Sequence, residues 1–166
     1  MKISNDTRNV LKNFSTINSG IKVTSGKKLQ TISNMKNILA VATVDEDFPQ
    51  DFSIYNLPEF LGATSLLEDA DFQFGDASVT ISDTNSALAY FYASEGMVTS
   101  PEKMITMPDA EVSFDVSSSL LSDLNKAASV LGVNDLILKS DGTTMTLLVT
   151  DKKNTTSNSF SRTVGT

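Results

Sequence analysis

The first strong pattern along the chain is helical. Between residues 5 and 18, apolar residues recur at the spacing of one helical face and polar residues fall on the opposite face. The apolar positions are Val10, Leu11, Phe14 and Ile17, and the opposite positions are Asn5, Arg8, Lys12 and Ser15. We therefore expect a helix that buries its apolar side and exposes Arg8 and Lys12. The plain alternative is a solvated face that happens to be basic.

The same organisation recurs three times with little identity between the copies: a short strand, a helix, then three strands, in about fifty residues. The first copy starts at Ile3, and its strands are expected at 20–25, 28–33 and 37–44. The second has a strand and helix within 51–67 and strands at 71–75, 77–82 and 86–93. The third has a strand and helix within 111–132 and strands at 135–140, 144–151 and 158–164.

This repeat predicts an α+β fold made of βαβββ units, with antiparallel sheets and with the helices gathered on one side of them. Two copies fill residues 1–100 and form a first domain. Residues 101–110, with Pro101 and Pro108, lack periodicity and are predicted to be a connector. The third copy, 111–166, is predicted to be half of a second domain.

The third helix has a similar division of faces. Its inward stripe is predicted to be Leu120, Leu121, Leu124, Ala127, Ala128 and Leu131, and its outward stripe Ser119, Ser122, Lys126 and Ser129. Lys126 is therefore expected to be exposed on the helix side of the sheets, as Arg8 and Lys12 are.

Composition limits the chemistry. The 166 residues include no histidine and no cysteine, which excludes nucleophilic triads with histidine, imidazole acid–base catalysis and zinc sites built on these residues. The densest acidic clusters, Asp45–Asp47 and Glu68 with Asp69 and Asp71, fall between predicted elements, where such residues usually form turns. We expect no cofactor, no metal and no catalysis, and an enzyme that uses carboxylates alone is a minor alternative.

Charge is distributed unevenly along the chain. Residues 1–44 carry a net charge of +6, residues 45–124 of −15 and residues 125–166 of +2, within a total of −7. Such asymmetry indicates a face that attracts a polyanion on a body that repels it. No apolar run approaches the length of a membrane span, and no leader is evident, so we expect a soluble, intracellular protein without a membrane partner.

Three stretches, MKIS at residues 1–4, LKNFSTINSGI at 11–21 and DFSIYNLPEFLG at 51–62, resemble the sliding clamps of T-even-type bacteriophages. Weaker similarity continues to SRTVG near the end of the chain. The resemblance implies a ring-shaped processivity factor of the replicative DNA polymerase, acting in the cytoplasm of an infected bacterial cell. It also implies helices that line a central hole for duplex DNA, sheets on the outer rim, and trimers of two-domain subunits, which gives twelve repeats per ring.

The resemblance also suggests which residues meet the partners. Lys12 and Lys126 match basic helix positions that face the hole, whereas Arg8 lies on the same face by helical geometry. Asn5 and Ser129 stand where the family tends to be basic, so the inner surface is expected to attract DNA weakly. A pocket for a polymerase peptide is implied near Met104, Ile105 and Met107, for which simple packing of the connector is the alternative. A clamp loader is a further implied partner.

The repeats number three where a two-domain clamp subunit has four, so the chain resembles a clamp that lacks its last quarter. A lone third repeat would leave its helix stripe and sheet face uncovered. We therefore expect two copies to join through residues 112–166 across a twofold axis, rather than to form the trimer of the family. A β-rich phage structural or scaffold protein without catalysis is the main competing interpretation.

Overall fold

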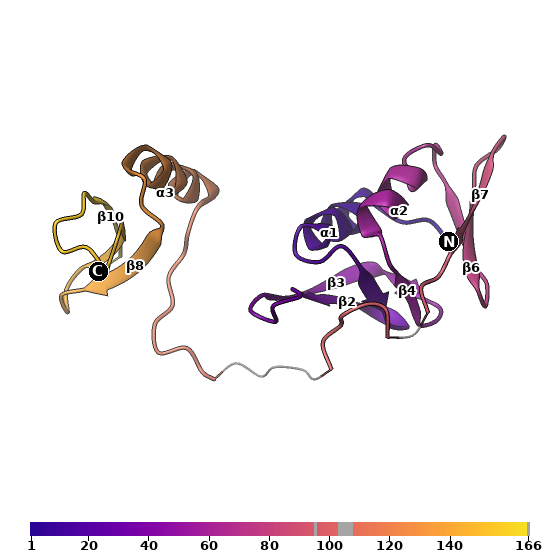
Figure 1. The fold of residues 1–166 in the computed structure, drawn as a ribbon, viewed down its shortest axis with the longest axis horizontal. Helices are drawn as coiled ribbons and strands as arrows, with labels where there is room; N and C mark the ends of the chain where they lie inside the picture. Colours follow the sequence, from indigo (N-terminus) through magenta and orange to yellow (C-terminus); the bar gives the residue numbers. More distant parts are fainter. Residues whose placement is uncertain (95, 103–107, 166) are drawn as a thin grey trace. The chain divides into compact units, whose positions relative to one another are not determined.

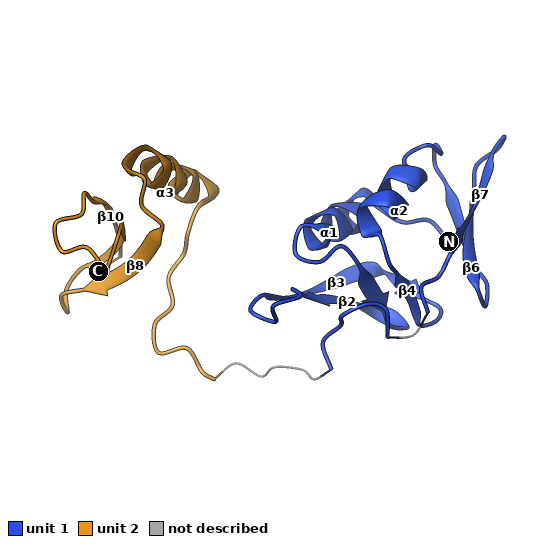
Figure 2. Ribbon diagram, viewed as in Figure 1, with its two compact units in different colours: residues 1–105 blue, residues 106–166 orange. Residues whose placement is uncertain are grey.

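The computed structural model describes residues 1–94, 96–102 and 108–165. The chain divides into two compact units, residues 1–105 and 106–166 (Figure 2). Met104, Ile105 and Met107, to which the resemblance assigns the peptide pocket, lie outside the described residues.

Unit 1 contains two repeats of one helix followed by three strands. In the first repeat these are α1 (Asn5–Ser15), β1 (Ile21–Val23), β2 (Gly26–Ile32) and β3 (Leu39–Phe48). The second opens with the strand β4 (Phe52–Ile54) and continues with α2 (Leu57–Thr64), β5 (Asp71–Phe74), β6 (Ser78–Ser82) and β7 (Ala87–Phe91). The predicted elements are confirmed, although α1 ends three residues before the expected Asn18.

All strand pairs of unit 1 within the described residues are antiparallel, and the two repeats interlock. Strand β2 pairs with β3, and β6 pairs with both β5 and β7. Strand β4 of the second repeat pairs with β1 of the first. The leading segment of the first repeat forms a bridge to the second, with Lys2 opposite Asp71. Each repeat therefore contributes its leading segment to the sheet of the other.

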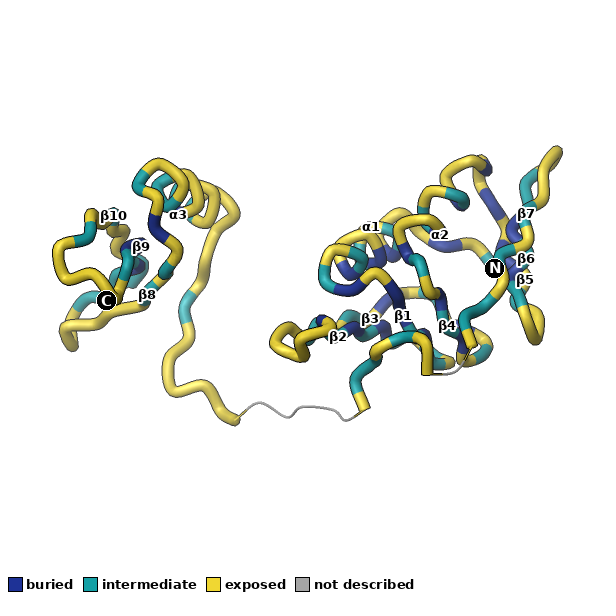
Figure 3. The backbone as a smooth tube through the Cα atoms, viewed as in Figure 1, coloured by how far each residue is buried: buried dark blue, intermediate teal, exposed yellow. Residues whose placement is uncertain are grey.

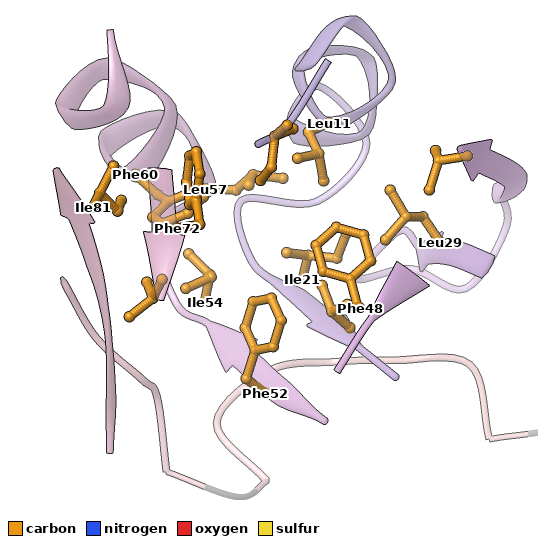
Figure 4. Packing of buried hydrophobic residues seen from close by; sticks show 14 of the residues in the cluster. Leu11, Ile21, Leu29, Phe48, Phe52, Ile54, Leu57, Phe60, Phe72 and Ile81 are labelled. Atoms are coloured by element: carbon orange, nitrogen blue, oxygen red, sulfur yellow. The ribbon is translucent and has the colours of Figure 1, made fainter. Parts of the chain in front are cut away.

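The core of unit 1 lies between the sheets and the two helices, which lie side by side on one side of β1–β4 (Figures 1 and 4). Both repeats supply it, since Leu11 and Ile21 from the first meet Leu57, Phe60 and others from the second. Aromatic rings continue the core, with Phe52 stacked on Tyr92 at a centroid distance of 5.3 Å. Shared burial of this extent makes the two repeats one folding unit.

Unit 2 consists of α3 (Ser118–Leu131) and a three-stranded antiparallel sheet. The sheet order is β10-β9-β8, with β8 (Asp135–Ser140), β9 (Met145–Thr150) and β10 (Phe160–Gly165). Gly132 ends α3 in the left-handed conformation, with φ of 66°, which a glycine adopts without strain. The fully buried part of its core is small, comprising Leu124, Val133, Leu147 and Val149.

Two predictions for the third repeat are wrong. Residues 111–116, expected to form a strand, contain none, although Phe114 packs against the core of unit 2. Leu121, expected to face inward, is 45% exposed. Leu121 follows Leu120 by about 100° around the helix, so the two adjacent leucines cannot both face a narrow core. The leading segment has no sheet from a second repeat to join within the described residues.

Candidate nucleic-acid interface

The cationic face of α1 starts from a well-defined helix end. The side chain of the N-cap residue, Ser4, accepts a hydrogen bond from the Thr7 backbone N–H at 3.2 Å. Asp6 in the first turn faces the positive end of the helix dipole. Thr7, Leu11 and other residues on the inner side are buried, which turns Arg8 and Lys12 toward the other side of the helix. The predicted amphipathic arrangement is thus present.

Glu46 of β3 also holds the N-terminus of α1. Its carboxylate accepts hydrogen bonds from the Ser4 backbone N–H and from the Thr7 hydroxyl. Burial alone raises the pKa of Glu46, but the hydrogen bonds from Thr7 and Ser4 outweigh it and bring the pKa to about 2. The sequence interpretation missed this role, because it placed Asp45–Asp47 at a turn whereas β3 runs through them.

Helix α2 forms the second wall of a groove beside α1. Asn56 caps its N-terminus by accepting from the Glu59 backbone N–H at 3.2 Å, and Pro58 lies in its first turn. The groove has a volume of about 410 Å³. It is lined by Arg8, Asn9, Lys12 and Ser15 of α1 and by Pro58, Leu61, Gly62, Thr64 and Ser65 of α2 and its C-cap. Its charged lining residues are Arg8 and Lys12, and both are cations.

The two cations differ in burial. Lys12 is exposed, as predicted, but Arg8 is half-buried, so the prediction that it is fully exposed is wrong. Its Nε atom is shielded from solvent and has no hydrogen-bond partner within the described residues. Arg8 lines the groove together with residues of α2, so a cation lies beside a groove that an anionic ligand can enter.

Lys126, in unit 2, is exposed on the outward side of α3. It lies in a shallow hollow of about 620 Å³ whose other lining residues are uncharged: Ser118, Leu121, Ser122, Asn125, Ser129 and Val130. The predicted outward placement is therefore present, with Ser122 and Ser129 on the same side. The lining of this hollow thus carries one cation, Lys126, among hydroxyl, amide and apolar groups.

Other kinds of site find little support in the described part of the chain. No group of three or more histidine, cysteine, aspartate or glutamate residues there is arranged to hold a metal ion. In the second acidic cluster, Asp69 pairs with Lys2. None of the described helices is long and apolar enough to cross a membrane.

Comparison with known proteins gives the family. The sequence profile described as DNA polymerase processivity factor matches residues 4–99, more than half of the chain. The chain belongs to this family of sliding clamps. It is 32% identical to the sliding clamp of Vibrio phage KVP40, an alignment that covers 99% of this chain and 77% of the relative. It is 33% identical to the sliding clamp of Enterobacteria phage T4, covering 83% of this chain.

The chain is shorter than these relatives. It spans 64% of the sliding clamp of Escherichia phage RB69 and 61% of that of phage T4. Solved structures support the fold: a Helicobacter pylori beta clamp matches with a TM-score of 0.61 and 19% identity, over 99% of this chain and 55% of that one. The Proliferating Cellular Nuclear Antigen of Entamoeba histolytica matches with a TM-score of 0.60 and 15% identity, over 95% and 69%. The predicted clamp fold is confirmed.

Proposed function

We propose that this chain acts as a sliding clamp, a processivity factor that encircles duplex DNA and tethers a replicative DNA polymerase in an infected bacterial cell. In this proposal residues 1–100 form the first clamp domain, 101–110 the connector and 111–166 one half of a second domain. The chain contributes no catalytic step. It holds DNA by enclosure, and its surface residues set how the DNA moves through the enclosure.

The groove between α1 and α2 is the observation that carries the proposal. Arg8 and Lys12 lie in one groove whose remaining lining is neutral, so a phosphate backbone meets positive charge without a competing carboxylate. Residues 45–124, which include α2, carry a net charge of −15, but none of their acidic residues lines the groove. DNA is attracted to the helix side and repelled by the acidic remainder of the chain.

Weak attraction suits sliding. Arg8, Lys12 and Lys126 are three candidate phosphate contacts per chain, against about 6 to 10 in a protein whose DNA affinity depends steeply on salt. In this proposal the cations contact phosphate oxygens and not base edges, so the contact is independent of sequence. A duplex is therefore guided along the groove and is not fixed at one position.

Charge reversal of these cations tests the proposal. In the variant Arg8→Glu, Lys12→Glu and Lys126→Glu, we expect weaker binding of a labelled double-stranded oligonucleotide and a shallower dependence of affinity on salt, measured by fluorescence anisotropy. Stimulation of a T4-like phage polymerase in primer extension should fall in parallel.

The matched control is Lys27→Glu, Lys36→Glu and Lys152→Glu, three exposed lysines outside the groove that change the net charge equally. Equal loss of binding in both triple variants would mean that net charge, and not the groove, governs the contact. Unchanged binding and stimulation in the groove variant would overturn the proposal and favour the structural or scaffold alternative.

The polymerase and a clamp loader are the proposed protein partners. We keep the prediction that an apolar peptide of the polymerase docks at Met104, Ile105 and Met107, which rests on the family resemblance alone.

A further inference from the structure

Residues 18–20, between α1 and β1, contact both helices of the groove through their backbone. The Asn18 N–H donates to the Phe14 carbonyl in the last turn of α1 at 3.0 Å. The Ser19 carbonyl accepts a hydrogen bond at 2.7 Å from the N–H of Leu57, the first residue of α2. One short segment of backbone therefore satisfies polar groups at the end of α1 and at the start of α2.

The side chain of Asn18 has a different set of partners. It is only 6% exposed, and its amide nitrogen donates to the carbonyl of Ile32, at the end of β2, at 2.9 Å. The same nitrogen donates to the Thr99 carbonyl at 3.1 Å, and the amide oxygen accepts from the Gly20 N–H at 3.0 Å. A side-chain amide has two protons to donate, so both have a partner here. Asn18 thus joins three segments that are far apart in the sequence.

Thr99 belongs to the stretch that leads from β7 to the connector. Directly after β7 this stretch passes beside β4, where the Ala93 N–H donates to the Ser53 carbonyl at 2.8 Å (Figure 1). In the described part of the chain, the hydrogen bond from Asn18 is the only one that joins residues 96–102 to residues 1–91. The attachment of the start of the connector to the first domain therefore depends on one buried side chain.

Gly20 allows this stretch to lie close to the junction. A Cβ added to Gly20 would lie 3.1 Å from the Cγ1 atom of Val98, and equally close to the carbonyl oxygens of Ile54 and Tyr55. These distances are shorter than an ordinary van der Waals contact of a side-chain carbon, so a glycine permits the close approach of the neighbouring chain. The Asn18 hydrogen bond to Thr99 therefore forms where the two segments are already in contact.

We propose that Asn18 is a positioning residue that fastens the start of the connector to the first domain, at the junction of α1 and α2. Its side chain holds Thr99, while the backbone of residues 18–20 holds the two helices of the groove. The chain therefore leaves the first domain at a point that is fixed relative to the groove. That this point matters for guiding DNA rests on the proposed function, whereas the attachment itself does not.

The substitution Asn18→Asp changes the donor side of this contact while keeping the size of the side chain. One carboxylate oxygen still accepts from the Gly20 N–H, but the other turns an acceptor toward the carbonyl oxygens of Ile32 and Thr99. The ionised variant should therefore release Thr99. A protonated carboxyl group has one O–H to donate, so acid should restore part of the contact. Burial and the two carbonyl groups favour the neutral form and raise the pKa of this carboxyl group.

The mobility of a spin label at residue 99 measures this release. The chain has no cysteine, the Thr99 side chain is exposed, and its contact with Asn18 uses only the backbone carbonyl, so Thr99→Cys can carry a nitroxide. In electron paramagnetic resonance spectra at about pH 8, we expect Asn18→Asp to raise the mobile fraction of the label at least about fivefold. Lowering the pH to about 5.5 should reduce this fraction in Asn18→Asp and leave the parent unchanged, because asparagine does not titrate.

Asn13→Asp is the matched control, since Asn13 is exposed on α1 and the change adds the same charge. A label at Thr84→Cys, exposed in the turn between β6 and β7, reports any general loosening of unit 1 and should not respond to Asn18→Asp. Asn18→Ser, which shortens the side chain without adding a charge, should mobilise the label at residue 99 at every pH, and circular dichroism checks folding.

An immobile label at residue 99 in both Asn18 variants would overturn the proposal. So would an equal rise in Asn13→Asp, an equal response at residue 84, or a rise in Asn18→Asp that acid does not reverse. None of these measurements uses DNA, so their outcome is separate from that of the charge-reversal test of the groove.

Discussion

At the scale of single residues, Glu46 shows how a surface carboxylate far along the chain fixes the functional helix. It satisfies the Ser4 N–H and the Thr7 hydroxyl at the start of α1, and an anion at this end of a helix is favoured by the helix dipole. The sequence pattern predicted α1 and its two faces correctly. It could not assign Glu46, because the partner lies 42 residues away and becomes visible only once β3 is placed beside α1.

We predict that Glu46→Gln lowers the free energy of unfolding by about 1 to 2 kcal/mol near neutral pH, since a charged acceptor at the helix start is lost. The pKa of Glu46 is about 2, below its ordinary value of 4.5. Its stabilisation is therefore fully present above about pH 4.5 and is lost as the pH falls toward 2. Thermal denaturation over this range should show the two proteins converging at low pH. Asp45→Asn, an exposed neighbour, should show no such convergence.

At the scale of elements, the spacing of apolar residues predicted the buried face of α1 correctly. It was wrong for Leu121 of α3, which is exposed. The spacing in α1 placed Leu11 and Phe14 inward and Lys12 outward. In α3 the adjacent leucines Leu120 and Leu121 both fit the apolar spacing, and the ion pair of Asp123 with Arg162 shows which flank of the helix faces β10. The contribution of α2 to the groove was also missed, because Gly62 and Ser65 carry no charge pattern.

The neutral wall of the groove gives a prediction with a closely matched control. Gly62 lies on α2, is exposed, and a Cβ added there meets no atom within 4 Å. Gly62→Glu and Gly62→Gln differ in little besides charge, and both should retain or slightly raise stability because glycine is a poor helix former. Only the glutamate should weaken binding of double-stranded DNA, most at low salt. Equal affinities of the two variants in the anisotropy assay would show that DNA does not enter this groove.

At the scale of the whole molecule, the pattern of the sequence predicted the three repeats, and the family resemblance predicted the clamp fold. Repeats one and two share a core that neither could form alone, as Leu57 and Ile21 illustrate. In unit 2 the fully buried core is small, and most of the described residues are half-buried or exposed (Figure 3).

The central claim, that the chain encircles DNA, is tested most directly by retention on DNA of different topology. The chain is loaded with a T4-like phage clamp loader onto nicked circular plasmid, and half of the sample is then cut once with a restriction enzyme before gel filtration. A clamp slides off free ends, so the account predicts that the chain elutes with the circular DNA and is lost from the linear DNA. Equal retention on both forms, or retention on neither, would contradict it.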